Sequence, residues 1–462
     1  MKLAFVVAFL CLLPSLHLNA QSVGLKFPSE EILDDLNYLK TSLEDTHYNL
    51  YAYVSREDFI ANYQEIVAAI NQDSLTQLQA ITLFQRVISA ANTGHAEIDF
   101  PAAAYLTYGK QNGTVFPLEV ALEDNKVYVR KNYSSNTAIQ PGDELLRING
   151  TNIQEIITAI HPQLSAESIY LKNAKLEFWS LPRLYWQLYG QHKNFDITVK
   201  SGKRTSTHTL AAVGLFEGYE IPRKDVLASN RRFELFNNSA YLNPGNFSGD
   251  EVIFRRFIDS AFTTINQAAS QNLIIDLRNN AGGHDAFSDY LSAYIAHRPF
   301  RWHAGFTLKS SSLLKDQTRL TADTTDAYSQ AILTHPDGDI FTYEFPLYKP
   351  HSTKMRFIGN VYVLINRQTY SMAAVTAALF QDQDLAIIVG EESGDYPTLH
   401  ASQFSYPLPN TSIRVKVPKG YIVRNGGGLQ TEGVQPDFLL QDHLLDDTDE
   451  VLTALLAKLE GK

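Results

Sequence analysis

Cysteine is almost missing from this sequence. The 462 residues include one, Cys11, which lies in an apolar N-terminal stretch that is expected to be removed on export. The mature chain therefore has no cysteine, so it forms no disulfide, has no thiol nucleophile and builds no thiolate metal site. A chain of this length can rely instead on a substantial hydrophobic core, with room for two to three domains.

An excess of positive charge is missing as well. The chain has 39 lysines and arginines against 50 aspartates and glutamates, which gives a formal net charge of -11. No stretch of the sequence gathers basic residues into a stripe, whereas a protein that binds nucleic acid normally presents a basic face. We therefore expect no nucleic-acid partner.

Long hydrophobic runs are also missing. A membrane-spanning helix needs about 20 apolar residues, and the apolar stretch Leu3–Leu13 is shorter than that. Lys2 precedes this stretch, and Pro14 and the small residue Ala20 follow it, which is the pattern of a secretory signal peptide rather than of a membrane anchor. We predict that residues 1–20 are cleaved, and that the mature protein is secreted or periplasmic with no membrane span.

Helical periodicity dominates the next part of the chain. Between residues 29 and 91, apolar residues recur every three or four positions in three separate stripes. These stripes predict three helices, and Ser55 and Ser74 are of the residue type that begins a helix. We predict a small N-terminal helical domain over residues 21–100. The stripes are Ile32, Leu33, Leu36, Leu39 and Leu43, then Phe59, Ile60, Tyr63, Ile66, Val67 and Ile70, and then Leu78, Ile81, Phe84 and Ile88.

Short strand patterns replace the helical pattern after residue 104. Strand-like runs cover residues 115–120, 126–130 and 145–148, and Asn149-Gly150 is a typical tight hairpin turn. Together with the turn at Pro141-Gly-Asp143, this stretch resembles the PDZ domain, in which similar pieces surround a peptide-binding groove. We predict a PDZ-like domain over residues 104–203, with a plain hairpin in a β-rich domain as the alternative.

Strands and helices alternate in the last part of the chain. Residues 273–277, 361–365 and 385–389 read as short buried strands, and the first two are each followed by a helical pattern. Two such units in tandem predict a largely parallel sheet with helices on its faces. We predict an α/β core over residues 204–450, interrupted by a weakly patterned insertion at about 300–356 near the active face.

Two adjacent glycines follow the first of these strands. The segment Asp276-Leu-Arg-Asn-Asn-Ala-Gly-Gly283 leaves the strand through polar residues and reaches Gly282 and Gly283 just before a helix. Paired glycines allow a sharp turn and expose backbone N–H groups that can hold an anion, either a phosphate or the oxyanion of an acyl-transfer intermediate. No phosphate-loop pattern accompanies them, so an oxyanion site or a plain turn remains.

Ser371 occupies the corresponding place after the second strand. Ligands bind at the carboxyl ends of the strands in such sheets, and the helix that begins after Ser371 favours negative charge at its N-terminus. The amide of Met372, with a second donor from Gly282 or Gly283, would form an oxyanion hole beside the serine hydroxyl. Alternatively, Ser371 is simply a helix cap, a role that contributes about 1 kcal/mol.

Four motifs in this order resemble those of the C-terminal-processing, or tail-specific, serine peptidase family. The resemblance runs with gaps from about residue 30 to 440. It implies an α/β fold with a crotonase/ClpP-like protease core, an N-terminal helical domain and a PDZ-like domain. The motifs are Asp276-Leu-Arg-Asn-Asn-Ala-Gly-Gly283, Thr369-Tyr-Ser-Met-Ala-Ala374, Val389-Gly-Glu391 and Glu432-Gly-Val-Gln-Pro-Asp437.

The family activates its serine in two ways, and the sequence favours one of them. The lysine type needs a lysine shortly after the third motif, where this chain has Gly390-Glu-Glu-Ser-Gly-Asp-Tyr396. The tricorn-like branch uses a histidine near the helical N-terminal region and a later glutamate, which implies His95 and Glu432. The serine that precedes the histidine in that branch is replaced here by Gly94, with Thr93 one step away.

The resemblance therefore implies a serine, histidine and carboxylate acting together. A serine hydroxyl needs an adjacent base, the pKa of histidine suits that task, and a carboxylate fixes the imidazole tautomer. Glu97 and Asp99 lie close to His95 in sequence and are alternatives to Glu432. The predicted catalytic residues are Ser371, His95 and Glu432, and the predicted oxyanion donors come from Gly282, Gly283 and Met372.

We expect an exported serine endopeptidase that cleaves polypeptides or their C-terminal segments. No metal or cofactor is expected, because the sequence has no His-Glu-x-x-His pattern and His284-Asp285 is too small a cluster. The alternative is a binding protein without peptidase activity. The same fold resembles the interphotoreceptor retinoid-binding protein, which carries hydrophobic ligands, and the 24 tyrosines and 25 phenylalanines would suit an apolar pocket.

Overall fold

The computed structural model describes residues 25–223, 227–428 and 431–461. The predicted signal peptide lies outside these residues. Among the helices that are described, none combines the length and the apolar composition needed to cross a membrane.

The N-terminal part contains the three predicted helices, α1 (Ser29–Thr46), α2 (Arg56–Ala68) and α3 (Gln77–Ser89). Ser55 caps α2 as predicted, because its side chain accepts the N–H of Asp58. Ser74 does not cap α3: it lies in the short strand β2 (Ser74–Thr76), which pairs with β1 (Lys26–Pro28). Thr76 caps α3 instead, through a reciprocal capping box with Gln79.

An antiparallel sheet with several helices forms the second part. Its strand order is β4-β5-β6-β8-β9, with β7 beside β6, and the predicted hairpin turn is present with positive φ at Asn149 and Gly150. The PDZ likeness itself stays a prediction. The elements are α4 (Ala102–Lys110), β3 (Thr114–Val115), β4 (Leu118–Glu123), β5 (Lys126–Asn132), β6 (Glu144–Ile148), β7 (Thr151–Asn152), α5 (Ile153–Ile160), a 3-10 turn (His161–Gln163), α6 (Ile169–Trp179), α7 (Leu181–Tyr189), β8 (Asn194–Ser201), β9 (Arg204–Ala211), β10 (Val213–Gly214) and a π-helix (Leu215–Glu220).

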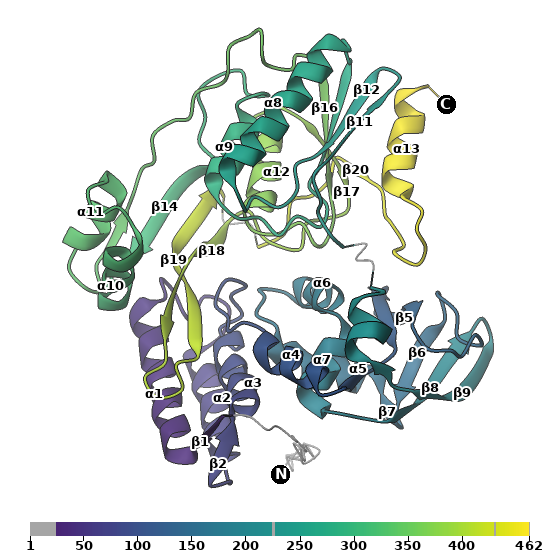
Figure 1. Cartoon of the computed structure of the whole chain (residues 1–462). Coiled ribbons are helices and arrows are strands. Elements are labelled where there is room, and N and C mark those ends of the chain that lie inside the picture. Colours follow the sequence, from purple (N-terminus) through teal and green to yellow (C-terminus); the bar gives the residue numbers. More distant parts are fainter. Residues whose placement is uncertain (1–24, 224–226, 429–430, 462) are drawn as a thin grey trace, which may run out of the picture.

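The α/β layer in the upper half of Figure 1 has the predicted parallel sheet, so the fold class is α/β. Strand order is β11-β12-β13-β16-β17-β20, and every pair is parallel except β11 with β12. The elements are β11 (Arg232–Phe236), β12 (Ser239–Asn243), α8 (Glu251–Gln267), β13 (Asn272–Asp276), α9 (Asp285–Ser292), β16 (Asn360–Ile365), α12 (Met372–Asp382), β17 (Ile387–Gly390), β20 (Phe438–Leu439) and α13 (Glu450–Leu459).

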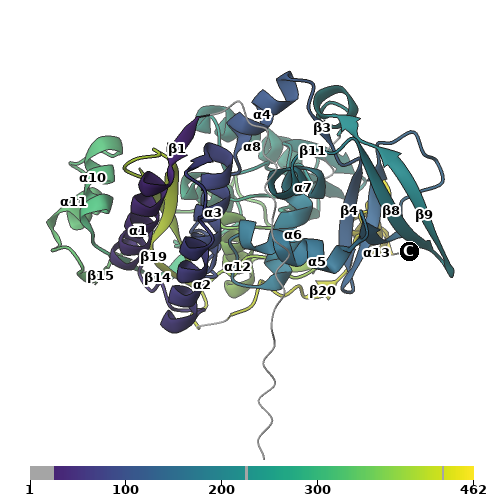
Figure 2. The same cartoon turned by 90° about the horizontal axis from the view of Figure 1, so that it is seen from below.

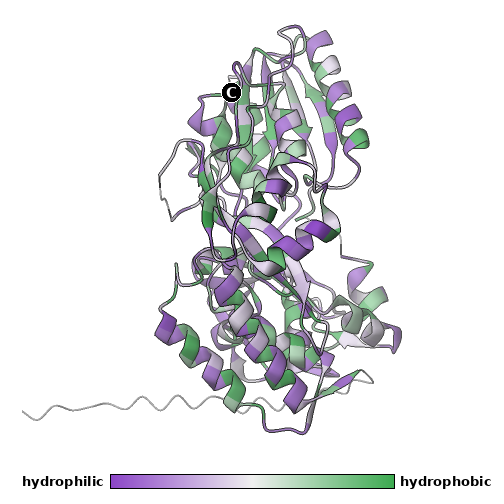
Figure 3. Ribbon diagram, turned by 90° about the vertical axis from the view of Figure 1, so that its left-hand side faces the viewer, coloured by the Kyte–Doolittle hydropathy of each residue, from purple (hydrophilic) through white to green (hydrophobic). Residues whose placement is uncertain are grey.

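Helices cover both faces of this sheet. Because successive side chains of a strand point to opposite faces, Leu273 and Ile275 pack in the main core with α8, α9 and α12, whereas Ile274 packs on the other face with α13. The ribbons of the helices carry hydrophilic and hydrophobic segments in alternation along their length (Figure 3), as expected for helices with one buried side. Burial on both faces explains why the strands read as continuous apolar runs.

The segment 300–356 is more regular than its sequence suggests. It contains β14 (His303–Lys309), α10 (Ser312–Thr321), α11 (Ala327–Thr334) and β15 (Ile340–Thr342), which the weak sequence pattern did not indicate. That the segment is an insertion stays a prediction. The strands join a four-stranded antiparallel sheet, β15-β14-β19-β18. The partner of β14 in this sheet, β19, lies far along the chain, and no local sequence pattern predicts such a pairing.

The hairpin of β18 (Leu399–Pro407) and β19 (Arg414–Arg424) connects the upper and lower parts of the molecule. It extends downward from the α/β layer and lies along α1 (Figures 1 and 2). An isolated bridge between Glu97 and Lys416 also joins β19 to the segment that follows α3. The loop that carries His95 is therefore held against the α/β layer by this hairpin.

Candidate active site

The Gly-Gly turn and Ser371 meet at one edge of the parallel sheet. Strands β13 and β16 are parallel neighbours, so the loops that leave their carboxyl ends emerge side by side. The N–H of Tyr370 donates to the carbonyl oxygen of Asn280 at 3.0 Å, which joins the two loops directly. The predicted proximity of the glycines and the serine is therefore present.

Ser371 has an unusual backbone conformation. Its φ of 53° and ψ of -127° lie in a region that residues with a side chain rarely occupy and that is often found at functional sites. It stands at the N-cap position of α12, but its hydroxyl makes no capping hydrogen bond, so the helix-cap alternative is wrong. Its Oγ lies 3.0 Å from Nε2 of His95 instead.

Tyr370 determines which nitrogen of His95 faces the serine. The two rings stack with centroids 4.8 Å apart, and the phenol oxygen lies 3.3 Å from Nδ1 of His95. The phenol donates its own hydrogen to the carbonyl of Gly94 at 2.8 Å, so towards the imidazole it acts as an acceptor. Nδ1 then carries the ring proton, and Nε2 presents a lone pair to Ser371.

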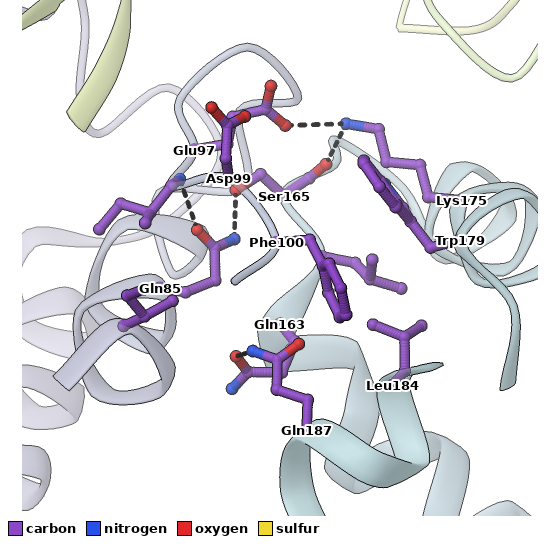
Figure 4. Close-up of a pocket in the computed structure, with 13 residues that line it drawn as sticks. Gln85, Glu97, Asp99, Phe100, Gln163, Ser165, Lys175, Trp179, Leu184 and Gln187 are labelled. Carbon is purple, nitrogen blue, oxygen red and sulfur yellow. Dashed lines mark hydrogen bonds and ion pairs between the residues drawn. The ribbon is translucent and has the colours of Figure 1, made fainter. Parts of the chain in front are cut away.

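Lys175 supports this arrangement from α6. Its ammonium group donates to the carbonyls of Gly94 and Ser165, at 3.0 and 2.7 Å, and to the hydroxyl of Tyr370 at 3.3 Å. Figure 4 shows the same side chain at the edge of a cavity of about 30 Å³, where it also approaches Glu97 at 3.9 Å. The phenol oxygen of Tyr370 therefore accepts two hydrogen bonds, one from the ammonium group of Lys175 and one from Nδ1 of His95.

Two carboxyl groups flank the imidazole, that of the buried Asp395 and that of the half-buried Glu167. Oδ2 of Asp395 accepts the N–H of Ser371 at 2.7 Å and lies 3.9 Å from Nε2 of His95. Oε1 of Glu167 accepts the N–H of Gly94 at 2.7 Å, whereas its Oε2 is buried without a hydrogen-bond partner. Burial raises the pKa of both carboxyl groups. Asp395 therefore helps to hold the strained backbone of Ser371.

Burial also acts on the imidazole. It lowers the pKa of His95 to about 3, and the positive charge of Lys175 adds to the effect. At neutral pH the ring is therefore uncharged, which is the form that can accept a proton. His95, Glu167 and Asp395 are close enough to hold a metal, with candidate ligand atoms within 4.8 Å of one another, but several of these atoms are already engaged in the hydrogen bonds described above.

The side chains of Glu167 and Tyr370 lie close to the position that a side chain of residue 94 would occupy. A Cβ at this position would lie 2.7 Å from Oε2 of Glu167 and 3.3 Å from the hydroxyl of Tyr370, so a serine here would require these two side chains to shift. Thr93 does not take over the bridging role, since its hydroxyl donates to the carbonyl of Ala91. Glu167 and Tyr370 occupy the space in its place.

The sequence-predicted carboxylates are not found on the imidazole. Glu432 is exposed, and its described contacts include no hydrogen bond or ion pair with His95. Glu97 faces Lys175, and Asp99 forms an ion pair with Lys416 at 2.5 Å. The structure thus brings Ser371 and His95 together but leaves Glu432 apart from the imidazole.

The Gly-Gly turn packs against the start of α12. A Cβ on Gly282 would lie 2.7 Å from the nitrogen of Met372, so a side chain at this position would displace the turn. The N–H of Gly282 donates to Oδ1 of Asn280, and the N–H of Ser371 is used by Asp395. Of the predicted oxyanion donors, Gly283 and Met372 are therefore better placed than Gly282.

Arg278 belongs to the scaffold rather than to the substrate site. Its guanidinium group forms ion pairs with Asp276 and Asp449, both at 2.7 Å. These carboxylates hold the pKa of Arg278 above its usual value despite burial. The arginine therefore joins the end of β13 to the start of α13.

Comparison with known proteins gives one family match and several structures of similar fold. Residues 238–440 match the model of Peptidase family S41. The structure of mature CPAF complexed with lactacystin has a TM-score of 0.63 at 16% sequence identity, covering 93% of this chain and 98% of that chain. Mature CPAF has a TM-score of 0.63 at 15% sequence identity, covering 93% of this chain and 97% of that chain. The photosystem II D1 C-terminal processing protease has a TM-score of 0.44 at 16% sequence identity, covering 92% of this chain and 97% of that chain.

Ser371 lies at the edge of the parallel sheet that the matched segment contains. Residues 238–440 are similar to peptidase family S41, and the chain is a serine-type peptidase.

Proposed function

We propose that the protein is an exported serine endopeptidase of the tricorn-like type, which cleaves polypeptides or their C-terminal segments through an acyl-enzyme on Ser371. The observation that carries the proposal is the 3.0 Å distance between Oγ of Ser371 and Nε2 of His95. The strained serine backbone and the uncharged, buried imidazole support it. Export is supported by the signal-peptide pattern of residues 1–20.

The reaction begins with proton transfer from Oγ of Ser371 to Nε2 of His95 as the oxygen attacks the peptide carbonyl carbon. The N–H groups of Met372 and Gly283 receive the negative charge on the former carbonyl oxygen. When the tetrahedral intermediate collapses, His95 gives its proton to the leaving amine and an ester on Ser371 remains. A water molecule then repeats the sequence and releases the new carboxyl end.

Tyr370 takes the place usually given to a carboxylate. It fixes the tautomer of His95 by accepting the Nδ1 proton, but a neutral phenol stabilises the imidazolium less than a full negative charge does. Asp395 and Glu167 are the acidic groups near the ring, so they are the residues on which charge stabilisation would depend. On this proposal, Tyr370 orients the base, and Asp395 and Glu167 lie where an ionised carboxylate would stabilise the imidazolium.

An active-site probe tests the proposal. The mature protein is treated with a fluorophosphonate, and the modified peptide is identified by mass spectrometry. We expect one modification, on Ser371, with none in Ser371→Ala and very little in His95→Ala. Ser260→Ala is the matched control, because Ser260 is exposed on α8. Folded protein that stays unmodified at Ser371 would contradict the assignment.

A further inference from the structure

A cavity of about 110 Å³ lies between helices α10 and α11 and the β18–β19 hairpin. Its lining includes Tyr328 from α11, Gln403 from β18 and Lys419 from β19. Nε2 of Gln403 donates to the main-chain oxygen of His95 at 2.9 Å. The cavity therefore adjoins the loop that carries the proposed base.

Lys419 has no anionic partner in this cavity. Among the described residues, its ammonium group forms no hydrogen bond or ion pair, and it lies over the ring of Tyr328, 5.8 Å from the ring centroid. Burial lowers the pKa of Lys419, because an ammonium group loses water there without gaining an anion. The buried arginines behave differently: Arg278, Arg367 and Arg424 each face a carboxylate.

Tyr328 supplies a second polar group. Its hydroxyl is buried and lacks a hydrogen-bond partner within bonding geometry, although Ser402 lies near enough to affect its pKa. A buried donor without a partner is costly. Lys419 and Tyr328 are therefore two donors lining one cavity, and an acceptor would satisfy both.

The cavity also lies near the Gly-Gly turn. Asp285, which follows Gly283 by two residues, acts through its charge on both Lys419 and Tyr328 without forming a bond to either. Gln403, which lines the cavity, bonds the main chain of His95, so the cavity lies beside the part of the proposed site that the His95 loop forms.

We propose that this cavity binds a carboxylate of the polypeptide substrate, with the ammonium group of Lys419 and the hydroxyl of Tyr328 as donors. The inference rests on the proposed peptidase function and names a substrate preference for it. A volume of about 110 Å³ admits a carboxylate group with part of its side chain or of its chain end. An Asp or Glu side chain and a free C-terminus share this chemistry.

Paired peptides distinguish the two sources. One pair differs by Glu against Gln near the cleavage position, and a second pair differs by a free against an amidated C-terminus. Binding is measured on Ser371→Ala, and cleavage on the active protein. We expect the acid of one pair to bind about tenfold more tightly than its amide, as for a hydrogen bond to a charged group, and kcat/KM to follow.

Variants connect this preference to the cavity. Lys419→Met should remove the acid preference and Lys419→Arg should retain much of it, while Tyr328→Phe should reduce it. Lys315→Met is the matched control, since Lys315 is on α10 but pairs with Asp337. Fluorophosphonate modification and thermal unfolding show whether each variant is folded.

The outcomes separate the two proposals. An acid-to-amide ratio near one in the unmutated protein, or a ratio that Lys419→Met leaves unchanged, overturns the carboxylate site. Acid-dependent binding that is lost in Lys419→Met but is accompanied by no cleavage of any peptide contradicts the peptidase function while retaining the site.

Discussion

The two halves of the proposed active site are built in different ways. The nucleophile half, Ser371 with the Gly-Gly turn, lies on loops that leave two adjacent parallel strands, and the sheet fixes their separation. The base half, His95, lies on a loop outside the sheet and is held by side chains from α6, from β18 and from Tyr370. The first half depends on backbone pairing and the second on individual polar contacts, so substitutions should affect them differently.

Removing either reacting group tests the comparison most severely. Ser371→Ala and His95→Ala should each lower kcat by about 10⁴-fold or more, as for groups that act as a unit. Peptide hydrolysis at saturating substrate measures the effect. The double variant should be no worse than the single ones, and an additive loss would contradict the pairing of the two residues.

Removing one hydroxyl tests the base half alone. Tyr370→Phe keeps the stacked ring but takes away the acceptor for Nδ1, and we expect kcat to fall about 10- to 100-fold, as for other residues that orient a histidine. A purely structural effect would not move the proton between the ring nitrogens, so the ¹⁵N NMR signals of His95 provide the second measurement. Unchanged signals together with unchanged kcat would show that another group fixes the tautomer.

The pH dependence of kcat/KM tests the burial of His95. Because burial lowers the pKa of His95 to about 3, the ring keeps its free lone pair at pH values at which an exposed histidine is protonated. We expect the acid limb to have its midpoint below 6.5, the value of an unperturbed histidine. A midpoint at or above that value would mean that the ring is more solvated, or faces more negative charge, than this structure shows.

The smallest effect is expected at Glu432. Since its side chain is exposed and makes no described contact with His95, Glu432→Gln should change kcat/KM by less than about threefold, within the usual range for an exposed substitution. Parallel kinetics with Tyr370→Phe are the useful comparison. A loss as large as that of Tyr370→Phe would return Glu432 to the role that the family resemblance assigns to it.

Local patterns in the sequence predict the elements but not the contacts between them. The helices from residue 29 onward and the parallel strands follow from periodicity and apolar runs, and the Gly-Gly turn and Ser371 follow from their places after those strands. His95 could be named only through the family resemblance, because its loop has no regular pattern. The strand β14 was missed because its partner β19 is remote in sequence.

Three residues around the base carried no sequence signal of their own: Lys175, Glu167 and Asp395. Each acts across a long separation in the chain, as when Lys175 reaches the carbonyl of Gly94. Tyr370 had one weak signal, its place directly before the serine. Glycine at position 94, read as a departure from the family pattern, leaves the space that the Glu167 carboxylate occupies in this structure.

The backbone of Ser371 carries a thermodynamic consequence. Conformations of this kind cost about 1–3 kcal/mol in a residue with a side chain, whereas glycine adopts them freely. An inactive chain with Ser371→Gly should therefore melt at a higher temperature than one with Ser371→Ala, although neither has a nucleophile. Selection for catalytic activity rather than for stability would then account for the serine at this position. A related chain that no longer needs catalysis would become more stable by replacing this serine with glycine.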